Sequence, residues 1–244
     1  MSFPVTKVPS GTRIAVIGDI HEHREHFDKI LERINPGPKT YVISVGDVYD
    51  KGFGPTAAEG IIDTLKPLIQ DGYAAILRGN HELKVIRKAR GTNTMNPYLD
   101  WMDKQPTALT FGFANNTHLT VVHGGVMPSH TWNNLFTDIE TCYVRNLDEK
   151  GKMIKKVWKK IDGKDTLVPE KPGGLPWHRL YDGRFGYIAS GHDAQRDGVP
   201  KFYNYSCNID TAVYDTGIMT AQIFSENGRE DLIMVSGTAK KPQL

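Results

Sequence analysis

The chain has 244 residues, 39% of them hydrophobic and 24% charged, which is the composition of an ordinary folded protein. This length allows a packed core, and the composition excludes low-complexity, collagen-like and disordered chains. The longest apolar runs have the length of a strand, far short of a membrane span, and the first residues contain no apolar segment of a secretory signal. Two cysteines exclude a disulfide framework and a four-cysteine zinc site. We therefore expect a cytoplasmic enzyme without membrane contact.

Positive charge is concentrated in one segment, although 30 basic and 28 acidic residues leave a net charge of only +2. The segment Lys150–Lys164 holds seven lysines and one aspartate. It would make a weak contact with a polyanion such as RNA or a polyphosphate. The alternative, which we favour, is a solvated hairpin or insertion near residues 145–175, whose lysines keep an exposed strand edge from pairing.

Apolar periodicity predicts different arrangements in the two halves of the chain. The first half alternates strands at 13–17, 40–45 and 73–77 with helices at 24–34, 56–69 and 82–90, as in βαβ units. The second half has strand candidates at 119–122, 187–190, 206–209, 217–224 and 232–235, with little helix between them. We expect a single mixed α/β domain over residues 1–244, built from two packed sheets with helices outside.

Small polar loops follow five of these strands. They read Gly18-Asp19-Ile20-His21, then residues 46–52 (GDVYDKG), residues 79–82 (GNHE), residues 123–125 (HGG) and residues 191–193 (GHD). Side chains at the carboxyl ends of neighbouring strands converge in space even when they are far apart in sequence. The sequence therefore predicts one site built from all five loops.

The residue types in these loops indicate the kind of metal. Carboxylate and amide oxygens mixed with imidazoles, without thiolates, suit manganese, iron, zinc or nickel. The loops supply too many ligands for one catalytic ion with an open position, so a two-metal centre with a bridging carboxylate fits better. Of these metals we favour manganese, because the ligands include three imidazoles. Magnesium is a further alternative.

These motifs, in this order, resemble the calcineurin-like metallophosphoesterase superfamily over Arg13–Thr220. The GNHE, HGG and GH forms are similar to its phosphoprotein phosphatase branch, which includes bacterial and phage serine/threonine phosphatases and the diadenosine-tetraphosphate hydrolases. The resemblance implies an α/β metallophosphoesterase sandwich of two mixed β-sheets flanked by helices. It also implies a hydrolase that attacks phosphorus with metal-bound hydroxide and forms no covalent phosphoenzyme.

The resemblance further implies a role for each matching residue. The metal ligands would be Asp19, His21, Asp47, Asn80, His123 and His192. Among them, Asp47 would bridge the two ions. His81 would be the general acid that protonates the leaving oxygen, and Asp50 would orient its ring.

The resemblance leaves the substrate open, because the sequence departs from the family pattern in places. Glu22 replaces the glycine that usually ends the first motif. His23, beside it, either has no role in the site, which we favour, or reaches the mouth of the site. Lys51 stands where the phosphatase branch usually has arginine, and this lysine, like Gly191–Arg196, resembles the ApaH-like phosphatases. HGG is closer to the protein phosphatases. The first hypothesis is hydrolysis of phosphomonoesters, including protein phosphoserine or phosphothreonine. The alternative is an ApaH-like hydrolase of dinucleoside polyphosphates or of nucleotide or RNA ends.

A second cation is expected to bind the substrate phosphate together with Lys51. The candidates are Arg145, Arg179 and Arg184, and we prefer Arg145 because similar proteins carry an arginine after HGG. Trp177 would either stack on a nucleobase or close an edge of the core. Asp210 is expected to have a structural, hydrogen-bonding role.

Two hypotheses from other functional classes are less favoured. A scaffold that has lost catalysis would need a damaged ligand set, and every ligand position is filled. A nucleic-acid-binding module using Lys150–Lys164 would bind with an affinity that falls steeply with salt and does not depend on metal.

Overall fold

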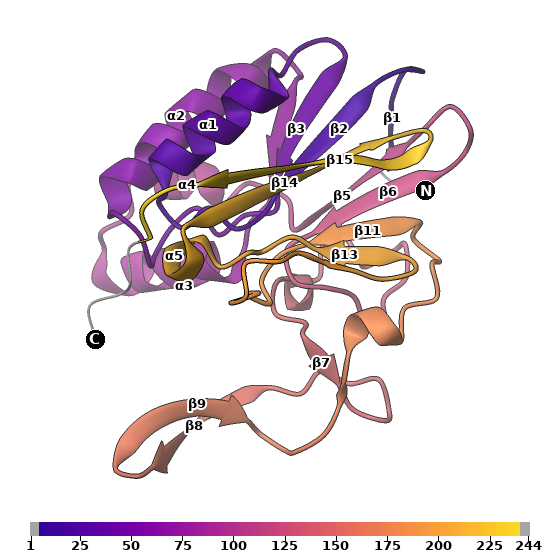
Figure 1. Ribbon diagram of the computed structural model, residues 1–244. Coiled ribbons are helices and arrows are strands. Elements are labelled where there is room, and N and C mark those ends of the chain that lie inside the picture. The colour runs from indigo at the N-terminus through magenta and orange to yellow at the C-terminus, as the bar shows by residue number, and fades with distance from the viewer. Residues whose placement is uncertain (1–4, 240–244) are drawn as a thin grey trace.

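A computed structural model describes residues 5–239. The first four residues, which belong to the segment where the sequence predicts no secretory signal, lie outside this range. Two facing sheets form its centre (Figure 1). The five-stranded sheet has the order β15-β14-β2-β3-β4. Its strands are β2 (Arg13–Ile17), β3 (Thr40–Ser44), β4 (Ala74–Ile76), β14 (Ile218–Ser225) and β15 (Gly228–Ser236). Strands β2, β3 and β4 are parallel, and β14 runs antiparallel to β2.

The six-stranded sheet has the order β1-β5-β6-β11-β13-β12. Its strands are β1 (Val5–Lys7), β5 (Ala108–Gly112), β6 (His118–Val122), β11 (Tyr187–Ser190), β12 (Lys201–Phe202) and β13 (Ser206–Asn208). Strands β6, β11 and β13 are parallel to one another. Both sheets therefore mix parallel and antiparallel pairs, which confirms the predicted fold class.

The alternation of side chains along β2 shows how the two sheets pack. Ile14 and Val16 point into the core between the sheets, against residues such as Leu119 of β6. Ala15 and Ile17 point outward, where they are buried under α1 (Arg24–Ile34) and α2 (Pro55–Gln70). Because successive side chains of a strand face opposite sides, the apolar run at residues 14–17 of β2 can fill both layers.

Further helices complete the outer layer. The outer face of the five-stranded sheet shares its apolar core with α3 (Asn80–Thr92) and α4 (Pro97–Met102), and α5 (Val213–Thr216) precedes β14. The outer face of the six-stranded sheet is packed differently. Loops and two 3₁₀ turns, η1 (Ile139–Cys142) and η2 (Trp177–Arg179), bring Trp177 and Phe185 against it.

The lysine-rich segment forms the hairpin that the sequence predicted. Strand β8 (Lys156–Ile161) pairs antiparallel with β9 (Lys164–Pro169), and the hairpin projects away from both sheets (Figure 1). A second small pair, β7 (Asn146–Leu147) with β10 (Leu175–Pro176), lies at its base. Across the residues that the structure describes, no helix combines the length and the apolar character that crossing a membrane requires.

Candidate metal centre

The structure brings the polar loops after β2, β3, β4, β6 and β11 together. His21 Nε2 lies 3.7 Å from Asp19 Oδ2 and 3.8 Å from Asp47 Oδ2. On the other side of Asp47, His123 Nε2 lies 3.3 Å from Oδ1 and 3.0 Å from Asn80 Oδ1. His192 belongs to this second group. One of its ring nitrogens lies within 4.8 Å of a carboxylate oxygen of Asp47 and of a ring nitrogen of His123. The six residues predicted as ligands therefore form two groups with Asp47 between them.

Backbone carbonyl groups orient two of the imidazoles. His21 Nδ1 lies 3.0 Å from the Asp50 carbonyl oxygen, and His123 Nδ1 lies 3.0 Å from that of Val45. A ring that donates its Nδ1–H to a carbonyl carries its lone pair on Nε2, which in both residues faces the carboxylates. Burial acts to lower the pKa of His123, but the charges of Asp47 and Asp19 outweigh it and raise that pKa to about 9, so a cation bound here would displace a proton from the ring.

The chemistry of the donor set fits a pair of divalent cations. Asp19, Asp47 and Asp210 are buried together, and burial and then the charge of Asp210 hold the pKa of Asp19 well above its usual range. Burial acts to raise the pKa of Asp47 too, but His123 and His81 outweigh it and hold that pKa well below its usual range. In addition, His192 Nε2 is buried without a hydrogen-bond partner. Buried anionic groups and an unpartnered buried nitrogen are costly unless a cation compensates them.

His81 lies at the edge of the centre, with 12% of its side chain exposed. Its Nδ1 is 2.9 Å from Asp50 Oδ2, as predicted, and its Nε2 is 3.8 Å from Asp47 Oδ2. The hydrogen bond with His81, followed by that from Lys84 at 2.7 Å, holds the pKa of Asp50 well below its usual range. Asp50 therefore stays ionised and can fix the ring with Nε2 turned towards the ligands. The same geometry also places His81 within one ligand group, with His21 and Asp47.

Two buried glutamates hold the loops that carry these residues. The backbone N–H groups of Asp50, Gly52 and Gly54 donate to the Glu22 carboxylate at 2.9, 3.0 and 2.8 Å. Glu82 accepts in the same way from four backbone N–H groups, those of residues 47, 48, 49 and 79. The contacts of Glu22 show what it does at the position where the family usually has glycine: its carboxylate clamps the loop that carries Asp50 and Lys51. Sequence reasoning missed both roles, although Glu82 belongs to the GNHE motif.

The candidate phosphate-binding cations are placed differently from one another. Lys51 Nζ lies 3.5 Å from His21 Nε2, next to the ligands. Arg145 donates to the carbonyl oxygen of His192 at 2.9 Å. Arg184 instead donates to the carbonyl oxygen of Met127, and Arg179 is exposed on η2. Of the three arginines, Arg145 is the one whose contacts reach a predicted ligand.

Three other residues singled out in the sequence are buried. Trp177 donates from Nε1 to the Gly124 carbonyl oxygen at 3.0 Å and is 2% exposed, so it belongs to the core and cannot stack on a nucleobase. Asp210 accepts from the backbone of Ala212, which agrees with a structural role. His23 is fully buried, with Nδ1 2.6 Å from the carbonyl oxygen of His21, so the alternative that it reaches the mouth of the site is wrong.

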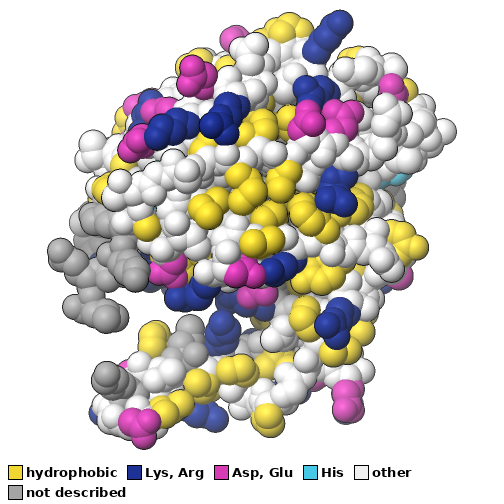
Figure 2. All heavy atoms as spheres, in the orientation of Figure 1, with side chains coloured by type: hydrophobic (Ala, Val, Ile, Leu, Met, Phe, Trp, Pro, Cys, Tyr) yellow, Lys and Arg dark blue, Asp and Glu magenta, His cyan; other side chains and the backbone are white. Residues whose placement is uncertain are grey.

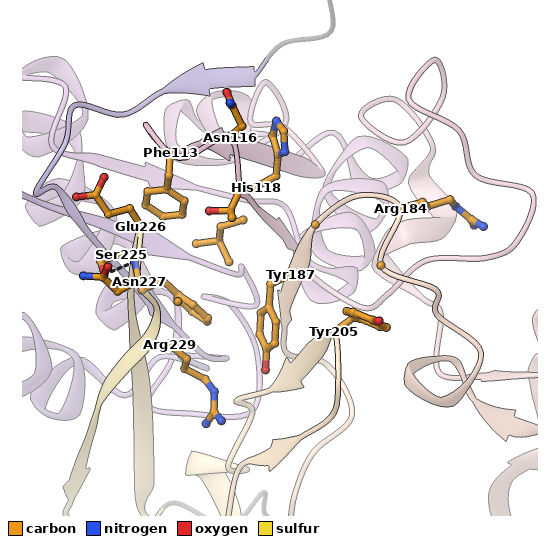
Figure 3. A pocket seen from close by; sticks show the side chains of 16 residues that line it. Phe113, Asn116, His118, Arg184, Tyr187, Tyr205, Ser225, Glu226, Asn227 and Arg229 are labelled. Atoms are coloured by element: carbon orange, nitrogen blue, oxygen red, sulfur yellow. Dashed lines mark hydrogen bonds between the residues drawn. The ribbon is translucent and has the colours of Figure 1, made fainter.

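A groove of about 590 Å³ runs from the centre to the base of the β8–β9 hairpin. Asn80 and His192 lie at one end, Arg145 lies between, and Lys155 and Lys156 lie at the hairpin end. A separate cavity of about 560 Å³ lies at the amino ends of β6 and β11 and the β14–β15 turn (Figure 3). Its rings, Phe113, Tyr187 and Tyr205, lie at the opposite ends of the strands from the predicted ligands. The groove, and not this cavity, adjoins the candidate centre.

Comparison with known proteins shows which family the chain resembles. The sequence pattern of the calcineurin-like phosphoesterase family matches residues 12–196. The chain is 25% identical to bis(5′-nucleosyl)-tetraphosphatase PrpE [asymmetrical] of Bacillus thuringiensis, over 86% of this chain and 90% of that protein. It is 24% identical to the serine/threonine-protein phosphatase 4 catalytic subunit of Saccharomyces cerevisiae, over 79% of this chain and 66% of that protein. A solved structure described as "a putative diadenosine tetraphosphatase" superposes with a TM-score of 0.68 at 24% identity, over 97% and 99% of the two chains.

Proposed function

The chain belongs to the calcineurin-like phosphoesterase family, and on that premise we propose that it hydrolyses phosphomonoesters at a dinuclear metal centre. Two groups of ligand atoms that share the buried carboxylate of Asp47 are the observation that carries this proposal. We assign six residues to the metals: Asp19, His21, Asp47, Asn80, His123 and His192. Manganese is our proposed ion, with iron, zinc, nickel and magnesium as alternatives.

Two bound cations would supply an activated water and neutralise charge on the phosphoryl group. The remaining work falls to the side chains at the rim. Lys51, beside His21, and Arg145, bonded to His192, would hold the phosphate oxygens. His81 would give a proton from Nε2 to the leaving oxygen, while Asp50 keeps the ring in that orientation through Nδ1.

Hydrolysis of dinucleoside polyphosphates is the second candidate function. It is favoured by the relatives named bis(5′-nucleosyl)-tetraphosphatase, since this chain covers 90% of the Bacillus thuringiensis protein against 66% of the yeast protein phosphatase subunit. The lysine at position 51 supports the same candidate. A cytoplasmic location stays a proposal, supported by two buried cysteines that are both free thiols.

Metal removal and reloading test the proposed function. The chelated protein should release no phosphate from p-nitrophenyl phosphate, and manganese should restore activity at least as well as magnesium. The matched variant Asp47→Asn, which replaces the bridging carboxylate by a neutral amide, should remain nearly inactive after reloading. Full activity of the metal-free protein would overturn the proposal. Comparing a phosphoserine peptide with diadenosine tetraphosphate then separates the two candidates.

A further inference from the structure

The β8–β9 hairpin presents two chemically different faces. Side chains alternate along a strand, so Lys156, Trp158 and Lys160 share one face of β8, and Val157, Lys159 and Ile161 share the other. On the first face, Lys156 is paired with Pro169 across the hairpin, and both residues line the groove that contains Asn80 and His192. The face that carries Trp158 is therefore the one that continues the groove away from the metal centre.

Trp158 is unusual for a tryptophan, because 71% of it is exposed. Trp177, which the sequence offered as a residue that could stack on a nucleobase, is buried in the core. Tryptophan rings usually contribute to a protein by being buried, and this one is mostly in contact with solvent. Trp158 is two residues after Lys156, which lines the groove. A strand rises about 3.3 Å per residue, so the two residues are separated by about 7 Å along β8.

Positive charge surrounds the path from the centre to this ring. Arg87, Arg145, Lys155 and Lys156 line the groove against one acidic residue, Glu140. Burial and the neighbouring charge of Arg145 lower the pKa of Lys156, while Asp193 acts to raise it. Dark blue side chains lie along the hollow between the hairpin and the body of the molecule (Figure 2). A chain of phosphates leaving the metal centre would meet cations at each step.

We propose that the face of β8 formed by Lys156, Trp158 and Lys160 is a nucleotide-binding subsite, in which the base of a nucleoside polyphosphate stacks on Trp158. The two lysines contact phosphates on either side of the ring, and Arg145 holds the phosphate next to the centre. This combination of an aromatic platform with flanking cations is how proteins bind bases without reading their identity. The proposal rests on the proposed hydrolysis at the metal centre, and it adds the part of the protein that would recognise the rest of the substrate.

The test compares neighbouring residues on the two faces of one strand. Trp158→Ala should raise the KM for diadenosine tetraphosphate about tenfold, since stacking contributes about 1–3 kcal/mol per base. The KM for tripolyphosphate, which has no base, should change far less. Ile161→Ala, on the opposite face, should leave both values within about twofold. Lys160→Gln should raise the KM for both substrates and weaken their salt dependence, whereas Lys159→Gln should do neither.

A binding measurement separates this subsite from the chemistry. Adenosine diphosphate added to the metal-free protein should quench the tryptophan fluorescence, and Trp158→Ala should abolish that quenching. Equal effects of Trp158→Ala and Ile161→Ala, or quenching that survives in Trp158→Ala, would overturn the subsite. The subsite would also be overturned by a combined result with two parts. The kcat/KM for a phosphoserine peptide would exceed that for diadenosine tetraphosphate, and Trp158→Ala would lower both values by the same factor. If no substrate is hydrolysed with metal present, the proposed function is wrong, and the fluorescence titration still decides the subsite.

Discussion

The imidazole of His81 has two neighbours that would give it two different roles. Its hydrogen bond with Asp50 suits a general acid, and its 3.8 Å approach to Asp47 would suit a ligand. We predict that His81→Asn retains the metals and loses protonation of the leaving oxygen, an effect of about 10²–10⁴-fold. The loss in kcat should be large for an alkyl phosphate such as phosphoserine and smaller for p-nitrophenyl phosphate, whose leaving group departs readily as an anion.

Metal content measured on the same samples provides the control. Asp50→Asn should show the same dependence on the leaving group, more weakly, because the ring is misoriented but still present. Loss of metal in His81→Asn would make His81 a ligand. Equal losses for all leaving groups would make it a binder of the ground-state phosphate.

Glu22 acts on the same chemistry through the backbone. Its carboxylate accepts three N–H groups of the loop that carries Asp50 and Lys51. In Glu22→Gln the amide nitrogen cannot accept a hydrogen bond, so at least one N–H group is left unsatisfied, at a cost of about 1–3 kcal/mol. We predict that kcat falls about tenfold while the protein stays folded and binds metal.

A matched control lies three residues away in the sequence. Glu25 is exposed and pairs with Lys29 on the surface of α1, so Glu25→Gln should leave kcat unchanged. Circular dichroism and metal analysis would check that Glu22→Gln differs from the wild type in turnover only. An unchanged kcat in Glu22→Gln would show that the loop does not depend on this carboxylate.

Single side chains that end a strand were the easiest part of the site to predict. His123 follows an apolar run directly, Asp19 and Asp47 follow one after a single glycine, and the structure brings the three together. Glu22 and Glu82 were missed in their structural roles because a carboxylate that accepts several backbone N–H groups leaves no periodic signal. Lys84 as a partner of Asp50 was missed for a similar reason, since that contact joins the β3 loop to the first half of α3.

Among the elements, the connection from β4 to α3 packs closely against the site. A Cβ atom on Gly79 would lie 2.1 Å from Asp47 Oδ1 and 2.8 Å from His123 Cε1. We predict that Gly79→Ala displaces the bridging carboxylate and removes most of the bound metal and activity. Gly91, near the end of the same helix, has no atom within 4 Å of such a Cβ. Gly91→Ala should therefore leave metal content and kcat unchanged and stabilise the protein by about 0.5–1 kcal/mol.

Elements with strong apolar periodicity were predicted closely, and short edge elements were not. The predicted strand at 13–17 and helix at 24–34 have the same bounds as β2 and α1. The helix predicted at 82–90 begins two residues earlier, so Asn80 and His81 lie in the first turn of α3. Strand β1, with three residues, was missed because it is defined by pairing with β5, about a hundred residues away; β5, which also pairs with the neighbouring β6, was missed as well. The order of strands in the sheets depends on such pairings and is not written in local periodicity.

At the scale of the whole molecule, buried histidines predict sensitivity to acid. Burial lowers the pKa of His178 to about 3, and the ring is stacked on Tyr203. An unfolded chain would bind a proton at this histidine near pH 6.5, whereas the folded chain would not until about pH 3. The free energy of unfolding should therefore fall as pH decreases through this window, by about 1.4 kcal/mol per pH unit from this residue.

Urea unfolding between pH 7 and 4 measures that slope. His178→Phe cannot take up a proton and keeps an aromatic ring beside Tyr203, so its stability should depend on pH less steeply than that of the wild type. The comparison is made at equal metal concentration, because the candidate ligands also titrate. Identical slopes for the two proteins would contradict a neutral, buried His178.

The central claim is that two facing sheets bring five loops together around two metal ions bridged by Asp47. Anomalous scattering from crystals loaded with manganese tests it most directly. The account predicts two peaks about 3.5–4 Å apart on either side of the Asp47 carboxylate, one beside Asp19 and His21 and the other beside His123 and His192. A single peak, or peaks away from Asp47, would contradict the account.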